Sequence, residues 1–143
     1  MILYLDTSAL VKRYVRESGS EEVSVLIEQA EVIGSSLLTQ VEMASALSKA
    51  VRMKWVDADP ADRAWRDFLS HWQSVARLSM TPVVAQRASR LAWEHGMRAY
   101  DAAHLAAALI WQESLESPVT LASYDRELWS AAQKEGMAAW PER

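Results

Sequence analysis

The sequence contains no cysteine, only three histidines and no excess of positive charge. The absence of cysteine excludes disulfides, thiolate zinc sites, iron–sulfur clusters and cysteine nucleophiles. His71, His95 and His104 fall in unrelated sequence contexts, which argues against a histidine-rich metal site. The formal net charge is −4, and this argues against a protein that holds nucleic acid mainly through overall positive charge.

Long apolar runs are also missing. The most apolar stretch, Leu105–Trp111, is far shorter than the roughly 18 residues that a membrane span needs. The few residues before Asp6 lack the basic start and the apolar length of a secretory signal. We therefore expect a cytoplasmic protein with no membrane partner. Its 143 residues, 50% of them hydrophobic, are typical of one globular domain over residues 1–143.

Short apolar runs alternate along the chain with segments of helical periodicity. This alternation predicts an α/β fold, a central parallel sheet of four or five strands flanked by helices. The expected strands cover residues 2–5, 32–37 and 119–123, with shorter ones at 78–81 and 137–140. The expected helices include one around 23–27, one from 39 to about 55, one beginning at 59–60, and others at 82–95, from 101 onward and at 127–135.

Local signals predict how two of these helices begin. Thr39 and Glu42 have the spacing of a capping box, and Val41, Ala44 and Leu47 would form the apolar face that follows. Asp59 is the expected N-cap of the next helix, with Pro60 in its first turn.

Four carboxylates occupy related positions in this pattern. Asp6 follows the first strand, Asp125 follows the strand at 119–123, and Glu42 and Asp101 fall in the first turns of helices. The carboxyl ends of parallel strands form the edge at which α/β proteins bind ligands, so Asp6 and Asp125 should share that edge. Helix capping explains any one of these acids alone, but it does not require them to gather in one place.

Four gathered carboxylates repel one another unless cations neutralise them. Hard oxygen donors without thiolates favour Mg²⁺, with Mn²⁺ as a plausible substitute. Such an ion lowers the pKa of a water molecule and neutralises charge on a phosphodiester during hydrolysis. The pattern therefore predicts metal-dependent phosphodiester hydrolysis.

Smaller polar residues accompany the acids. Ser8 and Ser123 are candidates to support the acids or to contact a phosphate oxygen, and Arg98 is the best candidate among the basic residues for a phosphate contact. The basic residues could equally form a solvated, ion-paired surface. His104 lies one turn after Asp101 and could face the site, but we expect a packing role for it.

The sequence resembles the PIN-domain family, specifically the VapC-type ribonuclease toxins of prokaryotic toxin–antitoxin pairs. The similarity extends over essentially the whole chain. It is carried by the segments 3–11, with Asp6-Thr7-Ser8, and 96–106, with Asp101, by Glu42, and by 123–128, with Asp125.

The resemblance implies a compact α/β/α sandwich and an endoribonuclease toxin that cleaves RNA with Mg²⁺. Asp6, Glu42 and Asp101 look like the acids that hold the ion, with Asp125 as the fourth, although Glu127 lies two residues on and could take that place. The resemblance also implies a homodimer and a cognate antitoxin protein that covers the active-site groove.

Two other functions use acids at strand ends. A non-catalytic phosphoacceptor domain needs adjacent acids on the first strand and a lysine on a late strand, where this chain has only Asp6 and Ser123. A phosphotransferase with Asp6 as nucleophile usually has a second acid two residues later, where this chain has Ser8. Both remain alternatives.

Overall fold

Five parallel strands form the centre of the protein in a computed structural model that describes residues 1–143. The strands lie in the order β3-β2-β1-β4-β5, and every neighbouring pair is parallel. The α/β prediction is confirmed, with five strands. Their bounds are β1 Ile2–Leu5, β2 Val32–Ser36, β3 Ala76–Leu78, β4 Val119–Ala122 and β5 Ala138–Trp140.

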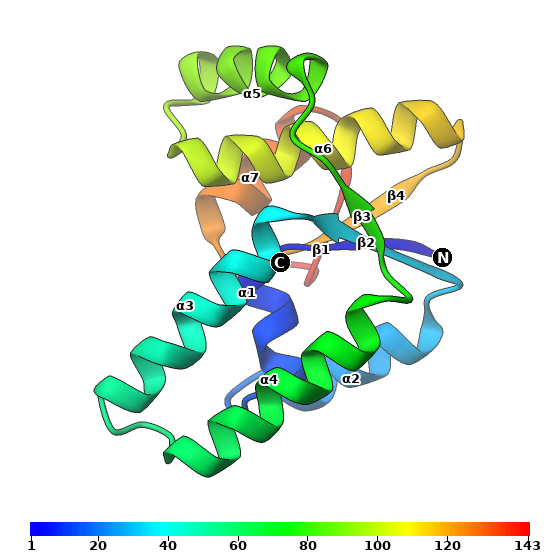
Figure 1. The fold of residues 1–143 in the computed structure, drawn as a ribbon. Helices are drawn as coiled ribbons and strands as arrows, with labels where there is room; N and C mark the ends of the chain where they lie inside the picture. Colours follow the sequence, from blue (N-terminus) through cyan, green and yellow to red (C-terminus); the bar gives the residue numbers. More distant parts are fainter.

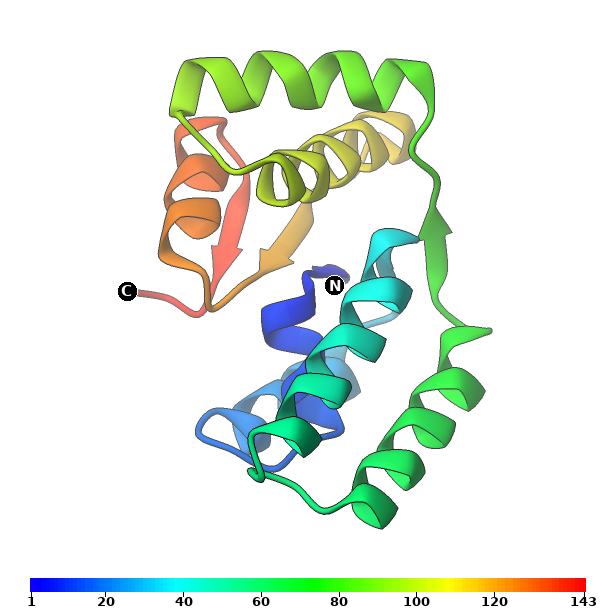
Figure 2. The same ribbon diagram turned by 60° about the vertical axis from the view of Figure 1, so that its left-hand side comes forward.

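Helices cover both faces of the sheet and make an α/β/α sandwich (Figure 1). One group, α5 to α7, packs on one face, and α1 to α4 lie on the other; the view in Figure 2 separates the two groups. The helices are α1 Thr7–Leu10, α2 Ser20–Gln29, α3 Leu38–Arg52, α4 Ala58–Trp72, α5 Pro82–His95, α6 Ala99–Leu115 and α7 Arg126–Lys134, and the 3-10 turn η1 Val11–Arg13 extends α1.

Alternation within β1 explains the two layers. Leu3 and Leu5 point to one face and pack with Met43 and Phe68, whereas Tyr4 points to the other face and packs with Leu105. Both clusters are fully buried, because parallel sheets are covered on both sides. The central strand thus contributes to two separate hydrophobic cores.

The alanines of α6 belong to the core of the chain itself. Ala102, Ala103, Ala106 and Ala107 are all buried against the sheet and neighbouring helices. These alanines therefore pack within the chain, as expected from the sequence. None of the helices is long and apolar enough to cross a membrane.

Two predicted helix starts are wrong. No capping box forms at Thr39, because α3 begins at Leu38 and the buried Thr39 hydroxyl is 2.7 Å from the Ser35 hydroxyl. The buried face of α3 carries Met43, Leu47 and Ala50, and Val41 is 67% exposed. Helix α4 begins after Asp57 instead of Asp59, which places Pro60 still within its first turn.

The remaining differences are small shifts of element ends. Strand β3 covers Ala76–Leu78 instead of 78–81, because it pairs with residues 34–36 of β2. The Thr81 hydroxyl instead accepts the Val84 N–H and caps α5. Helix α6 begins at Ala99, so Asp101 lies within its first turn, and α7 covers Arg126–Lys134.

Candidate active site

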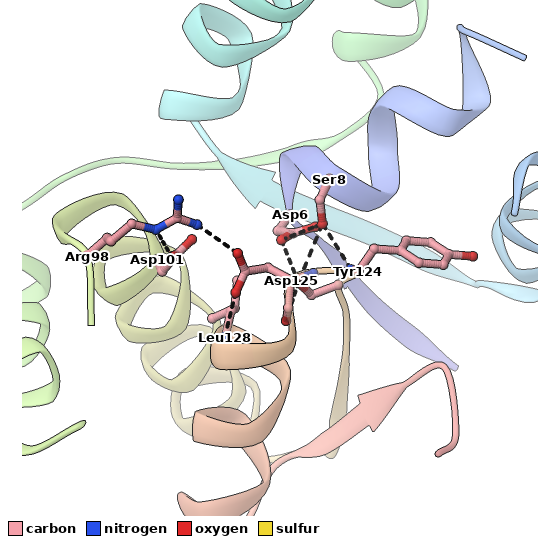
Figure 3. Close-up of polar contacts among 8 residues, drawn as sticks. Asp6, Ser8, Arg98, Asp101, Tyr124, Asp125 and Leu128 are labelled. Carbon is pink, nitrogen blue, oxygen red and sulfur yellow. Dashed lines mark hydrogen bonds and ion pairs between the residues drawn. The ribbon is translucent and has the colours of Figure 1, made fainter. Parts of the chain in front are cut away.

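The carboxyl ends of β1 and β4 bring Asp6 and Asp125 to the same edge of the sheet. Leu5 pairs with Ala122 in adjacent parallel strands, and the Asp6 N–H donates to the Ala122 carbonyl at 3.2 Å. Both aspartates cap a helix, since Asp6 accepts the Ala9 N–H and Asp125 accepts the Leu128 N–H. Figure 3 shows these two residues with Arg98 and Asp101 beside them.

Asp6 is the most buried of the four acids, with 3% of its surface exposed. Ser8 donates to both of its oxygens, at 2.7 and 2.9 Å, and Ser123 donates to Oδ2 at 2.6 Å. Burial raises the pKa of the Asp6 carboxyl, and these hydrogen bonds oppose that rise without cancelling it. Burial therefore makes the ionised form of Asp6 less favourable than it is in water.

Ser8 and Ser123 also connect Asp6 to the loop after β4. The Ser8 hydroxyl accepts the Tyr124 N–H at 2.9 Å, and the Ser123 hydroxyl accepts the Asp125 N–H at 3.0 Å. Each hydroxyl thus donates to Asp6 and accepts from the backbone. In the structure both serines support an acid and fix the backbone around it.

Glu42 comes from the first turns of α3 on the other side of Asp6. Its Oε1 accepts hydrogen bonds from Thr7, at 3.0 Å, and from His104, at 2.7 Å. Burial would raise the pKa of Glu42, but the hydrogen bonds from His104 and Thr7 outweigh it, and the pKa lies below its usual value. Glu42 is therefore ionised at neutral pH.

Arg98 joins the two remaining acids. Its Nε donates to Asp101 at 2.9 Å and its Nη2 donates to Asp125 at 2.7 Å (Figure 3). Burial raises the pKa of Asp101, the Arg98 bond lowers it and the nearby Asp125 charge raises it again, so that the net change is upward. Asp125, and not the exposed Glu127, is the acid in contact with this arginine.

Arg98 bridges Asp101 and Asp125, and the four predicted acids do not form one tight cluster. The only three acidic or histidine side chains whose ligand atoms all lie within 4.8 Å of one another are Glu94, His95 and Glu135, at the ends of α5 and α7. Arg90 already pairs with Glu94 and Glu135 there, at 2.6 and 3.5 Å. The proposed site residues are instead connected through Arg98, Ser8, Ser123 and His104.

His104 is buried and packed as expected, but it also has a place in the site. It does not serve only for packing, because its imidazole bridges Glu42 and the Tyr4 hydroxyl, at 2.7 Å to each. The spacing of three residues between Asp101 and His104 on α6 was the available signal. Tyr4 could not be recognised, since a buried tyrosine in a strand has the pattern of any core residue.

Five of the other 14 basic residues form ion pairs. Lys12 pairs with Glu17, Arg16 with Glu21 and Arg87 with Glu113. Of the two interpretations that the sequence left open, the ion-paired surface describes these three. Arg98 differs, because its partners are acids of the site and its side chain is 70% exposed.

The arrangement suits a hard divalent cation. The carboxylates of Asp6, Glu42, Asp101 and Asp125 supply only oxygen donors, which Mg²⁺ and Mn²⁺ prefer. Burial raises the pKa of Asp6, and burial together with the charge of Asp125 raises the pKa of Asp101. A cation bound beside these acids would lower both pKa values. In the structure the Arg98 guanidinium supplies positive charge beside Asp101 and Asp125.

Comparison with known proteins gives a consistent result. The PIN domain family model matches residues 3–134. Ribonuclease VapC49 of Mycobacterium tuberculosis is 33% identical over 144 residues, 98% of this chain and 95% of that protein. Ribonuclease VapC3 of Pyrobaculum aerophilum is 31% identical over 108 residues, 76% of this chain and 82% of that protein.

Solved structures show the same fold. The crystal structure of PAE2754 from Pyrobaculum aerophilum has a TM-score of 0.66 and 27% identity, covering 97% of this chain and 83% of that one. A toxin–antitoxin complex from Klebsiella pneumoniae contains a chain with a TM-score of 0.57 and 17% identity, and 84% of each chain is covered. At that identity the second likeness concerns the fold alone.

Proposed function

The chain belongs to the PIN domain family, and on that premise we propose that it is a Mg²⁺-dependent endoribonuclease, the toxin of a toxin–antitoxin pair. The observation that carries this proposal is the gathering of Asp6, Glu42, Asp101 and Asp125 at one edge of the sheet. The ribonuclease names of the relatives support the reaction class.

The four carboxylates would hold the cation. When bound, the ion supplies positive charge for the phosphodiester and lowers the pKa of a water molecule. The residues of the chain do the rest: Ser8 and Ser123 fix Asp6 from two sides, and Thr7 and His104 fix Glu42. Held in this way, the ligand oxygens need little rearrangement when the cation binds.

Arg98 is suited to a second task. Its guanidinium is exposed and lies next to two site acids. A cation that neutralises Asp101 and Asp125 would release the guanidinium, whose planar donors match a phosphate of the RNA backbone. We assign to it the role of holding the RNA backbone beside the acids.

The proposed partners are the RNA substrate, a cognate antitoxin protein and a second copy of the chain. The antitoxin is supported by the fold that this chain shares with a chain of the Klebsiella toxin–antitoxin complex. The phosphoacceptor alternative is disfavoured, because no second acid adjoins Asp6 at the end of β1 and no lysine directly follows β4, where Ser123 and Asp125 stand.

The test is RNA cleavage by purified protein with Mg²⁺ and with EDTA. We expect cleavage only with Mg²⁺, and a loss of roughly 100-fold or more in the Asp6→Asn variant, because metal-assisted stabilisation of the reaction is worth several kcal/mol. The control is Asp62→Asn, which changes an exposed acid paired only with Arg66. Equal cleavage by wild type and Asp6→Asn would contradict the assignment of the site.

A further inference from the structure

Two aromatic side chains behind Glu42 form a continuous hydrogen-bonded row with it. The Tyr4 hydroxyl lies 2.7 Å from Nδ1 of His104, and Nε2 of His104 lies 2.7 Å from Oε1 of Glu42. The two rings meet edge to face, with centroids 5.9 Å apart and planes at 77°. Tyr4 comes from β1, His104 from α6 and Glu42 from α3, so that the row joins both layers of helices through the central strand.

The row is held rigidly because its inner members are buried. Tyr4 is fully buried and His104 is 2% exposed, whereas Glu42 is partly exposed at the outer end. Side chains packed at native density keep a single rotamer, so the imidazole has no other orientation available. The position of Nε2 is therefore fixed relative to the sheet.

The hydrogen bonds also define which imidazole nitrogen carries the proton. The Tyr4 hydroxyl is fully buried and donates its proton within the row. His104 Nδ1 is the only acceptor that this hydroxyl meets. With Nδ1 accepting, the imidazole proton lies on Nε2 and is donated to Glu42.

This donation determines which oxygen of Glu42 remains free. Thr7 and His104 both donate to Oε1, at 3.0 and 2.7 Å, and Oε2 makes no hydrogen bond within the chain. Of the two Glu42 oxygens, Oε2 therefore has more lone-pair capacity left for a cation than Oε1 has.

We infer that Tyr4 and His104 are positioning residues, which fix the rotamer of Glu42 and present its Oε2 to the divalent cation. Neither residue touches the cation or the RNA. The inference rests on the proposed function only in taking Glu42 as a cation ligand. Partners of this kind behind a ligand typically change metal affinity by about 10- to 100-fold when removed.

The first experiment measures Mg²⁺ affinity by calorimetry. We expect His104→Leu, which fills the space but cannot donate, to weaken binding by about 10- to 100-fold. His104→Gln should restore nearly the affinity of the wild type, since an amide can accept from Tyr4 and donate to Glu42. The matched control is His95→Leu, which removes another histidine hydrogen-bonded to a glutamate, Glu135, outside the site. It should leave the affinity unchanged.

The second experiment needs no cation. Nitrogen NMR of the imidazole distinguishes the two tautomers, and we expect the wild type to show the proton on Nε2 of His104. Tyr4→Phe removes only the hydroxyl and should convert this single form into a mixture of tautomers. It should also weaken Mg²⁺ binding, though less than His104→Leu does. Tyr4→Phe keeps the packing volume, so the role of the Tyr4–His104 hydrogen bond can be tested even if His104→Leu fails to fold.

Three results would overturn the inference. They are wild-type Mg²⁺ affinity in His104→Leu, equal losses in His104→Leu and His104→Gln, and a wild-type imidazole with its proton on Nδ1. Failure of the proposed function gives a different result, because the wild-type protein would then bind no Mg²⁺ at all. In that case the tautomer of His104 still decides whether the row holds Glu42 as described.

Discussion

Asp6 shows at the scale of one residue that a site can reduce the stability of the fold. Its pKa lies above the ordinary value of 3.8 mainly because of burial. The folded state therefore binds the Asp6 proton more tightly than the unfolded state does. Ionised Asp6 destabilises the folded state once the pH exceeds the unfolded value, and this effect grows until the pH passes the folded pKa.

The first prediction follows from this sign. In metal-free buffer at neutral pH, Asp6→Asn should raise the melting temperature by roughly 3 °C, the shift that ~1 kcal/mol gives a domain of this length. The gain should shrink as the pH falls through the raised pKa of Asp6, because the wild-type carboxyl is then protonated. Melting curves over a pH series measure it. Asp62→Asn serves as the control, and a lower melting temperature for Asp6→Asn at neutral pH would show that its charge is stabilising.

A second residue-scale prediction concerns Arg98, whose guanidinium would compete with a cation for Asp101 and Asp125. Arg98→Gln should bind Mg²⁺ more tightly, by up to about 10-fold, because it removes the positive charge that competes with the cation for these two acids. RNA cleavage should fall nonetheless, because the phosphate contact is lost. Calorimetry and a cleavage assay on one preparation separate these effects. Arg66→Gln, which breaks a surface pair with Asp62, should change neither.

The positions of the site acids, and Ser8 and Ser123 beside Asp6, could be predicted from the sequence, whereas the hydrogen-bond partners of Glu42 could not. Asp6 and Asp125 follow strands whose ends are visible in the apolar pattern, and the structure places both at one edge. The bond between His104 and Glu42 joins residues 62 positions apart. The spacing of residues within one helix or strand cannot predict such a contact, since it depends on how α6 and α3 pack across the sheet.

At the scale of elements, helix ends were predictable where the signal is local. Pro82 begins α5 and Gly96 ends it in the left-handed conformation, as their sequence pattern indicates, whereas the N-cap Thr81 was expected in a strand. The capping box at Thr39 failed because its hydroxyl lies beside Ser35 of β2 instead. Tertiary contacts of this kind override local propensity, and they also account for the shifted start of β3.

The contact between β2 and α6 gives an element-scale prediction. A Cβ atom at Gly34 would lie 2.5 Å from the ring of Trp111, which is buried in α6. Gly34→Ala should therefore destabilise the protein by about 1–3 kcal/mol through overpacking, measured by urea unfolding. Gly34→Ala with Trp111→Leu should recover part of the loss. Additive losses in the double variant would place the effect in the backbone instead.

At the scale of the whole molecule, the positions of the acidic and basic residues explain how a protein with negative net charge could bind RNA. Four of the 19 acidic residues are the proposed cation ligands, so the net charge of −4 does not exclude RNA. Many of the basic side chains are occupied by acidic partners. We therefore expect weak RNA binding in EDTA that falls further with salt. Tight, salt-insensitive binding without Mg²⁺, measured by fluorescence anisotropy with the Asp6→Asn protein, would contradict this expectation.

Cation binding should also stabilise the entire fold. The site acids come from both sides of β1, so they are brought together only in the folded state. Mg²⁺ at 100 times its Kd should therefore add about 2.7 kcal/mol to the free energy of unfolding. Chemical denaturation with and without Mg²⁺ measures the increment, with Ca²⁺-free buffers throughout. Asp6→Asn should show little of it, whereas Asp62→Asn should show all of it.

The order of the strands has a consequence for synthesis on the ribosome. Strand β1 is the first to be made and occupies the middle of the sheet, but its neighbour β4 is completed only at Ala122. A chain released before that point lacks Ser123 and Asp125 and leaves one side of β1 unpaired. Prematurely terminated products of this sequence would therefore be inert, so that the nuclease proposed here would become active only when its translation is nearly finished.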